Sequence, residues 1–340
     1  MYEVSSNQTF SKTLMITMRA AENTGDGINL LDLNTDRSFT NSIYYTMRAV
    51  WRPIRLQGSS VAVLGIVLAA ICLLGCIGPD EVPPATAARI GVIVSVLPQA
   101  DFVERVGGER VAVTVMVPPG ASPHTYEPTA SQLREVSEAE IYFIVGSGME
   151  FENAWLERII GIHPELKVVS CADGITKHGT DPHIWTSPAN AKIMVEHICT
   201  GLVELDPEHE SEYTANRDEY LHELDNLDVY IHERLDPATT YRAFLIYHPA
   251  FGHFAADYNL TQIPIEHNGK EPTPQVIQDC ITYAQQYNLS YVYVAPQFAT
   301  KEAEMIADEI DGQTVFIDPL PRNYIATMRS IAAALARELE

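Results

Sequence analysis

The sequence predicts an α/β fold of two lobes, each a mainly parallel four-stranded sheet flanked by helices, joined by a long backbone helix. From residue 89 onward, short β-branched and apolar runs alternate with helical segments. Strands buried on both faces give such continuous apolar runs, and the alternation favours parallel βαβ units. A charged helical stretch over residues 208–235 interrupts this pattern midway. We therefore expect an N-terminal lobe at 89–207, a connecting helix at 208–236 and a C-terminal lobe at 237–340.

In the first lobe the alternation predicts four strands, at residues 90–96, 111–117, 141–145 and 168–169. The helices are expected at 99–106, 131–137, 151–160 and 189–205. Gly107-Gly108 ends the first of these helices, and Ser187-Pro188 begins the last. Both pairs are typical helix boundary signals.

The second lobe repeats this order after the connecting helix. Its strands are expected at residues 244–247, 260–265, 291–295 and 315–317, and its helices at 251–258, 274–287, 301–310 and 323–339. Along the connecting helix the apolar residues recur at a spacing of three, four or seven, which places them on one face. They are Tyr213, Tyr220, Leu224, Leu227 and Ile231.

Composition narrows the class of protein. The 340 residues carry 45 acidic and 22 basic side chains, for a formal net charge of −23, and 46% are hydrophobic. This length and apolar content suffice for two buried cores. The acidity argues against nucleic-acid binding, which needs a basic surface, and is compatible with attracting cations. Cys171, Cys199 and Cys280 allow either one disulfide or buried thiols, and their spacing does not choose.

An uncharged segment over residues 56–79 predicts export. Its core, residues 61–74, is entirely apolar or glycine and ends in Leu-Leu-Gly before Cys76. Three arginines precede it, Arg48, Arg52 and Arg55. We interpret residues 47–76 as a signal peptide that ends in a lipobox, with Cys76 lipidated and at the mature N-terminus. An uncleaved anchor helix is the alternative, but the run is short for a span of ~20 residues.

The segments around this signal have simpler interpretations. Residues 1–46 lack periodicity and are expected to be disordered or to precede the true start at Met47. Residues 77–88 are rich in proline and alanine and predict a flexible tether. Both interpretations of the apolar segment place the rest of the chain outside the cytoplasm, anchored to the outer face of the cytoplasmic membrane.

Four potential metal ligands follow predicted strands or open a helix. His124 comes after the second strand, His183 before the helix at 189, and His248 and Asp318 at strand ends. Ligands of open α/β sheets bind beyond the carboxyl ends of the strands. Two of the four lie in each lobe, so a shared site would sit in the cleft between the lobes. Three imidazoles and one carboxylate suit tetrahedral Zn²⁺.

The segments around these residues carry a family resemblance. They read Pro-His-Thr-Tyr-Glu-Pro at 123–128, Asp-Pro-His-Ile-Trp-Thr-Ser-Pro at 181–188, His-Pro-Ala-Phe-Gly-His-Phe at 248–254, Gly-Lys-Glu-Pro-Thr at 269–273, Ala-Pro-Gln-Phe at 295–298 and Ile-Asp-Pro-Leu at 317–320. From about Arg89 to the C-terminus the chain resembles the solute-binding proteins of zinc and manganese ABC transporters, the ZnuA/TroA-like family.

The resemblance implies two α/β lobes on a rigid backbone helix, with the metal ion buried between the lobes. We expect the protein to be a monomer. It assigns ligand roles to His124, His183, His248 and Asp318. It also implies delivery of the metal to an ABC transporter permease, driven by a separate ATPase. The rigid helix implies limited movement of the lobes.

The ligand set bears on the identity of the metal. Manganese members resemble this pattern but place a carboxylate at the third site, where this chain has His248. Imidazole nitrogen favours zinc over manganese. The loop 177–180 offers a single histidine, whereas zinc members often have a His-rich loop, and the segment 266–272 resembles manganese members as much as zinc members. We expect Zn²⁺ to be the transported ion, with Mn²⁺ or Fe²⁺ as the alternatives.

Two other classes of protein are less compatible with the sequence. A secreted zinc hydrolase would keep an open metal position and a general base, whereas here a fourth protein ligand is expected to close the shell. The sequence contains neither a His-Glu-x-x-His helix nor a Gly-x-Ser-x-Gly elbow. Gly146-Ser147-Gly148 is interpreted as a turn, and His253 as a packed or solvated histidine on a helix, with an auxiliary ligand role as the alternative. No sequence feature supports a surface adhesin, so we expect a binding protein and not an enzyme.

Overall fold

The computed structural model describes residues 89–237, 242–266, 269–298 and 301–339. All of these belong to one unit of the chain, Pro83–Glu340. Several segments discussed above lie outside the described residues: the possible start at Met47, the signal peptide, Cys76 and the tether. Within the described ranges, none of the helices combines the length and the apolar character needed to cross a bilayer.

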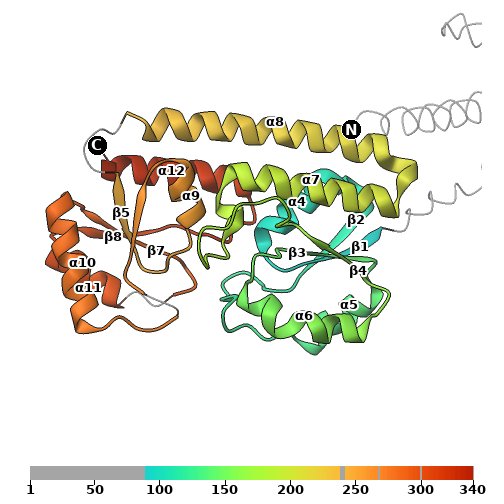
Figure 1. Cartoon of the computed structure of the whole chain (residues 1–340), viewed down its shortest axis with the longest axis horizontal. Helices are drawn as coiled ribbons and strands as arrows, with labels where there is room; N and C mark the ends of the chain where they lie inside the picture. The colour runs from blue at the N-terminus through green and yellow to red at the C-terminus, as the bar shows by residue number, and fades with distance from the viewer. Residues whose placement is uncertain (1–88, 238–241, 267–268, 299–300, 340) are drawn as a thin grey trace, which may run out of the picture. The chain divides into compact units, whose positions relative to one another are not determined.

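The first lobe is built on a parallel sheet with the strand order β2-β1-β3-β4 (Figure 1). The strands are β1 (Ile90–Val94), β2 (Val111–Val115), β3 (Ile141–Ile144) and β4 (Lys167–Ser170). The helices are α4 (Leu97–Gly107), α5 (Ala130–Glu138), α6 (Glu150–Ile162) and α7 (Pro188–Leu205), with short 3₁₀ turns η1 (Gly108–Arg110) and η2 (Ile184–Thr186). In register, Val92 pairs with Val113 on one side and with Ile141 on the other.

Local sequence explains where helices of this lobe begin. The Thr129 hydroxyl accepts the Gln132 amide hydrogen while the Gln132 side chain accepts that of Thr129, which forms a capping box before α5. Ser187 caps α7 by accepting the amide hydrogen of Asn190, and Pro188 fills the first turn, where its missing N–H is not needed.

The second lobe repeats the topology with the parallel order β6-β5-β7-β8. Its strands are β5 (Ala243–Ile246), β6 (Thr261–Pro264), β7 (Tyr291–Val294) and β8 (Gln313–Phe316). Its helices are α9 (Gly252–Asp257), α10 (Pro274–Tyr287), α11 (Lys301–Glu309) and α12 (Tyr324–Leu339). The predicted fold class is confirmed: each lobe holds a four-stranded parallel sheet flanked by helices.

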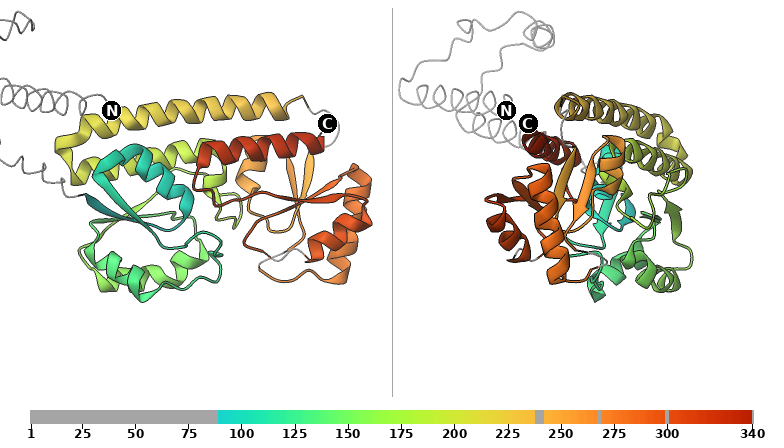
Figure 2. Two further views of the ribbon diagram at one scale, coloured as in Figure 1. Left: turned by 180° about the vertical axis from the view of Figure 1, so that it is seen from behind. Right: turned by 60° about the vertical axis from the view of Figure 1, so that its left-hand side comes forward.

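A 26-residue helix, α8 (Glu210–Leu235), runs along both lobes (Figures 1 and 2). It packs against α4 and α7 of the first lobe and against α12 of the second. Its buried face is formed by Tyr213, Tyr220, Leu224, Leu227, Ile231 and Leu235. The α-helix begins two residues later than expected, because a 3₁₀ turn, η3 (Pro207–His209), precedes it.

The three cysteines of the described body are buried free thiols: Cys171, Cys199 and Cys280. Of the two alternatives that the sequence left open, the structure has buried thiols. Burial raises the pKa of the Cys280 thiol to about 11, so this group stays protonated and unreactive near neutral pH.

Candidate metal centre

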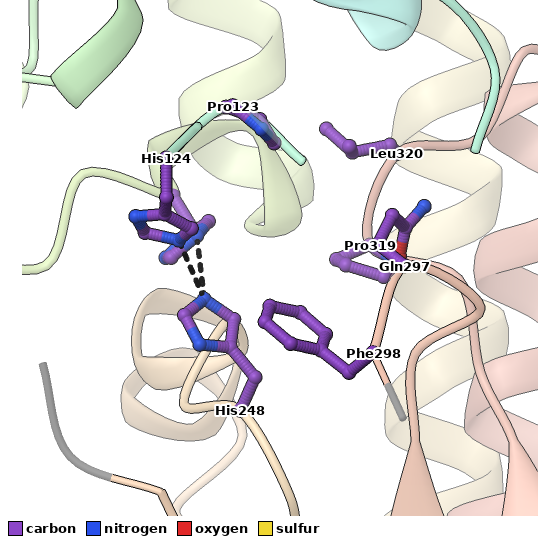
Figure 3. Close-up of a pocket in the computed structure, with 8 residues that line it drawn as sticks. Pro123, His124, His248, Gln297, Phe298, Pro319 and Leu320 are labelled. Carbon is purple, nitrogen blue, oxygen red and sulfur yellow. Dashed lines mark hydrogen bonds between the residues drawn. The ribbon is translucent and has the colours of Figure 1, made fainter. Parts of the chain in front are cut away.

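Three histidines from loops at the carboxyl ends of strands meet at one point. Their ligand nitrogens all lie within 4.8 Å of one another. The Nε2 atom of His248 is 3.1 Å from that of His124 and 3.4 Å from that of His183. In Figure 3 the His124 and His248 rings point toward each other. Zinc–nitrogen bonds of about 2.0–2.1 Å give tetrahedral edges of about 3.3–3.4 Å, close to these two separations.

His124 is presented by a turn after β2. The Ala121 amide bonds the Pro118 carbonyl, and the amide of His124 donates to the Ser122 hydroxyl at 3.3 Å. Gly120 has a φ of +79°, a backbone conformation that a residue with a side chain rarely adopts. The half-buried ring places Nδ1 3.1 Å from an oxygen of Glu150, at the start of α6.

His183 lies after β4, immediately before η2. The Asp181 carboxylate accepts two hydrogen bonds from it, from the backbone N–H at 3.0 Å and from Nδ1 at 2.7 Å. Burial tends to raise the pKa of the Asp181 carboxyl, but the hydrogen bonds and the charge of His183 outweigh burial and lower it. The carboxylate therefore stays ionised and fixes the orientation of the ring.

His248 lies two residues after the end of β5 in the second lobe. The Glu266 amide donates to the Tyr247 carbonyl at 2.8 Å, which extends the pairing of β5 and β6 and brings Glu266 beside the histidine. His248 Nδ1 donates to Glu266 Oε2 at 2.8 Å, and both side chains are buried. Burial again opposes ionisation, yet the hydrogen bond and charge of His248 lower the pKa of Glu266. The Phe298 ring stacks on His248 at a centroid distance of 4.5 Å.

The carboxylates decide what the cluster can bind. Nδ1 of His183 and of His248 is hydrogen-bonded to a carboxylate, and Nδ1 of His124 lies 3.1 Å from a Glu150 oxygen; in the tautomer that these acids favour, with the proton on Nδ1, each Nε2 presents a lone pair. Three lone pairs that converge at this spacing repel one another unless they share an electron-pair acceptor. A soft or borderline cation fulfils this requirement, and carboxylates on the far side of the ring raise the basicity of metal-bound imidazoles.

Asp318 follows β8 beside this pocket, but its carboxylate is not one of the group that lies within 4.8 Å. Its Oδ1 accepts hydrogen bonds from Gln297 Nε2 and from the Leu320 amide, both at 2.9 Å. Pro123 and the three histidines line the pocket together with Gln297, Phe298, Pro319 and Leu320 (Figure 3). The structure thus brings three of the four expected ligands together and places the loop of the fourth at the pocket wall.

His253 is packed, which decides between the packed and the solvated histidine that the sequence left open. It is 1% exposed on α9, where its Nε2 lies 3.3 Å from the Asp181 carbonyl and its Nδ1 lies 3.2 Å from the Asn190 amide nitrogen. Both ring nitrogens are therefore engaged away from the cluster. Burial lowers the pKa of His253, which keeps the ring neutral.

Sequence reasoning did not assign the carboxylates that orient the histidines. Asp181 stands inside a segment that carried the family resemblance, and Glu266 begins the segment 266–272 that was compared between zinc and manganese members. A rule that pairs each candidate ligand histidine with an acid would have considered both. Glu150 offers no comparable signal, because it lies 26 positions after His124 and meets it only through the fold. Gly146-Ser147-Gly148 forms the turn before α6, and the Ser147 hydroxyl donates to the Pro182 carbonyl at 2.6 Å.

The fold and the histidine cluster together point to a class of metal receptor. The sequence profile described as "Zinc-uptake complex component A periplasmic" matches residues 92–338, and the chain therefore belongs to this family. The family comprises metal-binding transport receptors and not enzymes, and its members include periplasmic proteins and lipoproteins.

Individual relatives differ in the metal that their names state. The manganese-binding lipoprotein MntA of Halalkalibacterium halodurans is 30% identical over 238 residues, covering 67% of this chain and 78% of that protein. The high-affinity zinc uptake system protein ZnuA of Bacillus subtilis is 25% identical over 252 residues, covering 68% and 79%. A crystal structure of a ZnuA protein superposes with a TM-score of 0.72 at 39% identity, covering 74% of this chain and all of that one.

Proposed function

We propose that this protein is the extracytoplasmic receptor of an ABC importer that captures Zn²⁺ between its two lobes and delivers the ion to a membrane permease. The observation that carries this proposal is the convergence of the Nε2 atoms of His124, His183 and His248, each with its Nδ1 on a carboxylate. Such a group binds a cation through nitrogen and holds it without any reacting substrate. Zn²⁺ is the cargo of this site.

The donor set supports zinc over manganese or iron. Imidazole nitrogens suit Zn²⁺, whereas Mn²⁺ favours oxygen ligands and higher coordination numbers. Asp318 is proposed as the fourth ligand, supported by the position of its loop at the pocket wall. The named metals of the relatives include both manganese and zinc, so Mn²⁺ is the second candidate.

Delivery and anchoring complete the proposal. Cys76 carries the lipid that tethers a monomeric receptor to the outer face of the cytoplasmic membrane. A permease and its ATPase then take up the released ion. The formal net charge of −23 attracts divalent cations toward the receptor. Because the imidazoles must be unprotonated to bind metal, the affinity is expected to fall in acid and to favour release there.

Metal analysis and competitive titration of Zn²⁺ against Mn²⁺ on the purified full-length chain test the capture step. We expect one zinc per chain and tighter binding of Zn²⁺, with His124→Ala, His183→Ala and His248→Ala each weakening zinc by at least about 100-fold. His209→Ala is the matched control. That histidine also holds a carboxylate through Nδ1, at 2.7 Å from Asp206, but it lies outside the cluster.

The outcomes separate the candidates. Preference for Mn²⁺ would keep the receptor role and change the cargo. Absence of tight metal binding, or an equal loss in His209→Ala, would overturn the proposal. For delivery, zinc uptake that depends on this chain should disappear in cells without the permease. Cys76→Ser should abolish incorporation of labelled fatty acid into the protein, and absence of label in the native chain would overturn the lipid anchor.

A further inference from the structure

Asp318 is held by a side chain from the neighbouring strand end. Strands β7 and β8 pair in parallel, with Val294 opposite Phe316, so the loops that follow them leave the same edge of the sheet. Gln297 lies on the first of these loops and Asp318 on the second. The Gln297 Nε2 atom donates to Asp318 Oδ1 at 2.9 Å, and the Leu320 amide donates to the same oxygen at 2.9 Å.

Gln297 also faces the histidine pocket. It lines this pocket beside Phe298 and Pro319, across from His124 and His248 (Figure 3). Its other amide atom, Oε1, is buried and accepts no hydrogen bond from the described residues. A buried carbonyl without a donor costs free energy. The Gln297 side-chain amide is therefore oriented by its hydrogen bond to Asp318, although this orientation leaves its Oε1 without a donor among the described residues.

This bond limits how Asp318 can bind a metal. A carboxylate oxygen has two lone-pair sites, and two N–H donors occupy both sites of Oδ1. Only Oδ2 is left for an ion, so Asp318 can supply one ligand atom and not two. With three imidazoles, one oxygen gives the four-coordinate shell that Zn²⁺ prefers. A bidentate carboxylate would add a fifth, oxygen ligand, which favours Mn²⁺.

We propose that Gln297 is a specificity-determining positioning residue that restricts Asp318 to a single ligand oxygen and thereby favours Zn²⁺ over Mn²⁺. This inference rests on the proposed function, because it assumes that Asp318 completes the shell around a captured ion. Gln297 acts through Asp318 and does not itself bind the metal.

Gln297→Leu removes one of the two donors and leaves one lone-pair site of Oδ1 free for a metal ion, while the Leu320 amide keeps the other. The purified full-length variant is titrated with Zn²⁺ and Mn²⁺ in competition, and its Co²⁺ form is examined by visible absorption. We expect the preference for Zn²⁺ over Mn²⁺ to fall about 10-fold, the lower limit for a partner that orients a ligand. The strong visible bands of four-coordinate Co²⁺ should weaken, because a fifth ligand lowers their intensity.

The chain offers a matched control on an exposed helix. Gln275 Nε2 donates to Asp279 Oδ1 at 2.9 Å on α10, the same pair of groups without a pocket. Gln275→Leu should leave the metal preference and the Co²⁺ spectrum unchanged. An equal shift in this control would overturn the inference. Gln297→Met, which has a similar length but no N–H donor, should reproduce Gln297→Leu and replaces it if the leucine variant does not fold.

A second background separates this inference from the proposed function. In Asp318→Ala, the additional Gln297→Leu change should have no effect on metal preference, because the carboxylate is gone. A full effect in that background, or no effect of Gln297→Leu in the native background, would overturn the role of Gln297 while zinc binding through the histidines stands. Failure of the native chain to bind either metal would instead overturn the proposed function itself.

Discussion

At the scale of single residues, the carboxylate partners of the histidines differ in burial. Glu266 is 3% exposed, whereas the Glu150 side chain is 52% exposed. A solvated ion pair contributes little because water screens it, while a buried hydrogen bond to a charged group is stronger and fixes geometry. The orientation and basicity of the three imidazoles therefore do not depend equally on the neighbouring carboxylates, although a carboxylate lies beside each Nδ1.

This difference gives a direct comparison between two glutamates. Glu266→Gln should lower zinc affinity about 10–100-fold, because the amide cannot raise the basicity of His248 as a carboxylate does. Glu150→Gln should lower it less than about 3-fold, the range of an exposed pair. Competitive zinc titration of both variants at one pH measures this. Equal losses would show that burial of the acid does not control ligand strength.

At the scale of elements, a carboxylate on the last helix holds the start of β7. Glu338 on α12 accepts hydrogen bonds from the amides of Ser290, at 2.6 Å, and Tyr291, at 2.9 Å. Burial raises the pKa of the Glu338 carboxyl to about 7, although both backbone bonds act to lower it. Docking of α12 on this sheet is thus linked to protonation.

The raised pKa sets the direction of a pH effect on stability. Between the ordinary value of 4.5 and about 7 the folded state holds a proton that the unfolded state has released. The free energy of unfolding should therefore fall as pH rises through this window, by about 1–2 kcal/mol after allowance for partial solvent exposure. Urea unfolding of the native chain and Glu338→Gln at pH 5 and pH 8 tests this. In Glu338→Gln this decrease in the free energy of unfolding between pH 5 and pH 8 should be absent. An identical pH dependence in both proteins would contradict the role of Glu338.

The elements were largely predictable from sequence, and their ends were not. Residues 111–117 were expected as one strand because all are apolar or β-branched, yet β2 ends at Val115. Met116 and Val117 are buried and donate to Val94 and Ser95, but they belong to the loop that leads to His124. A run of apolar residues can thus continue past the end of a strand, because residues of the following loop are buried as well. The order of strands in each sheet follows from packing between segments far apart in the chain, which periodicity does not encode.

At the scale of the whole described body, Trp185 connects a loop of the first lobe, which carries His183, with a loop of the second lobe, which carries Asp318. Its indole N–H donates to the Pro319 carbonyl at 2.6 Å, and its own carbonyl accepts from the Tyr324 hydroxyl at 2.8 Å. It is fully buried, and its ring lies 5.4 Å from that of His183. The loops that carry His183 and Asp318 are therefore held by one side chain.

Sequence located the candidate ligands but not this connection. His124, His183 and His248 stand in distinctive segments after strands, and the fold brings them together. Trp185 and Pro319 also stand in such segments, but 134 positions separate them. Only tertiary packing shows that one bonds the other. Asp318 illustrates the same limit, since its position after β8 was predictable and its engagement by Gln297 was not.

The shared core predicts how the described body unfolds. One buried cluster contains residues of both sheets, including Val94 and Phe143 from the first and Phe244 and Tyr293 from the second. A second cluster, which includes Leu245 and Val292, lies within the second lobe, on the same strands β5 and β7 that contribute Phe244 and Tyr293. The lobes should therefore unfold in one cooperative transition, and free Zn²⁺ at 100 times its Kd should add about 2.7 kcal/mol to the free energy of unfolding. Urea unfolding with and without zinc, followed by circular dichroism, measures both effects. Two separate transitions would contradict the shared core.

Trp185→Phe tests the link between the loops within the same experiment. Loss of the indole donor leaves the Pro319 carbonyl unpaired in the interior, which should cost about 1–3 kcal/mol. Trp155→Phe on α6 is the matched control, since Trp155 is only partly buried and stacks with Arg158. Because Trp185 bonds the loop of His183 to the loop of Asp318, both proposed to bind the ion, its loss should also reduce the zinc-induced increment, whereas Trp155→Phe should leave that increment intact. If both tryptophan variants kept the full increment, Trp185 would stabilise the fold without coupling the two ligand loops.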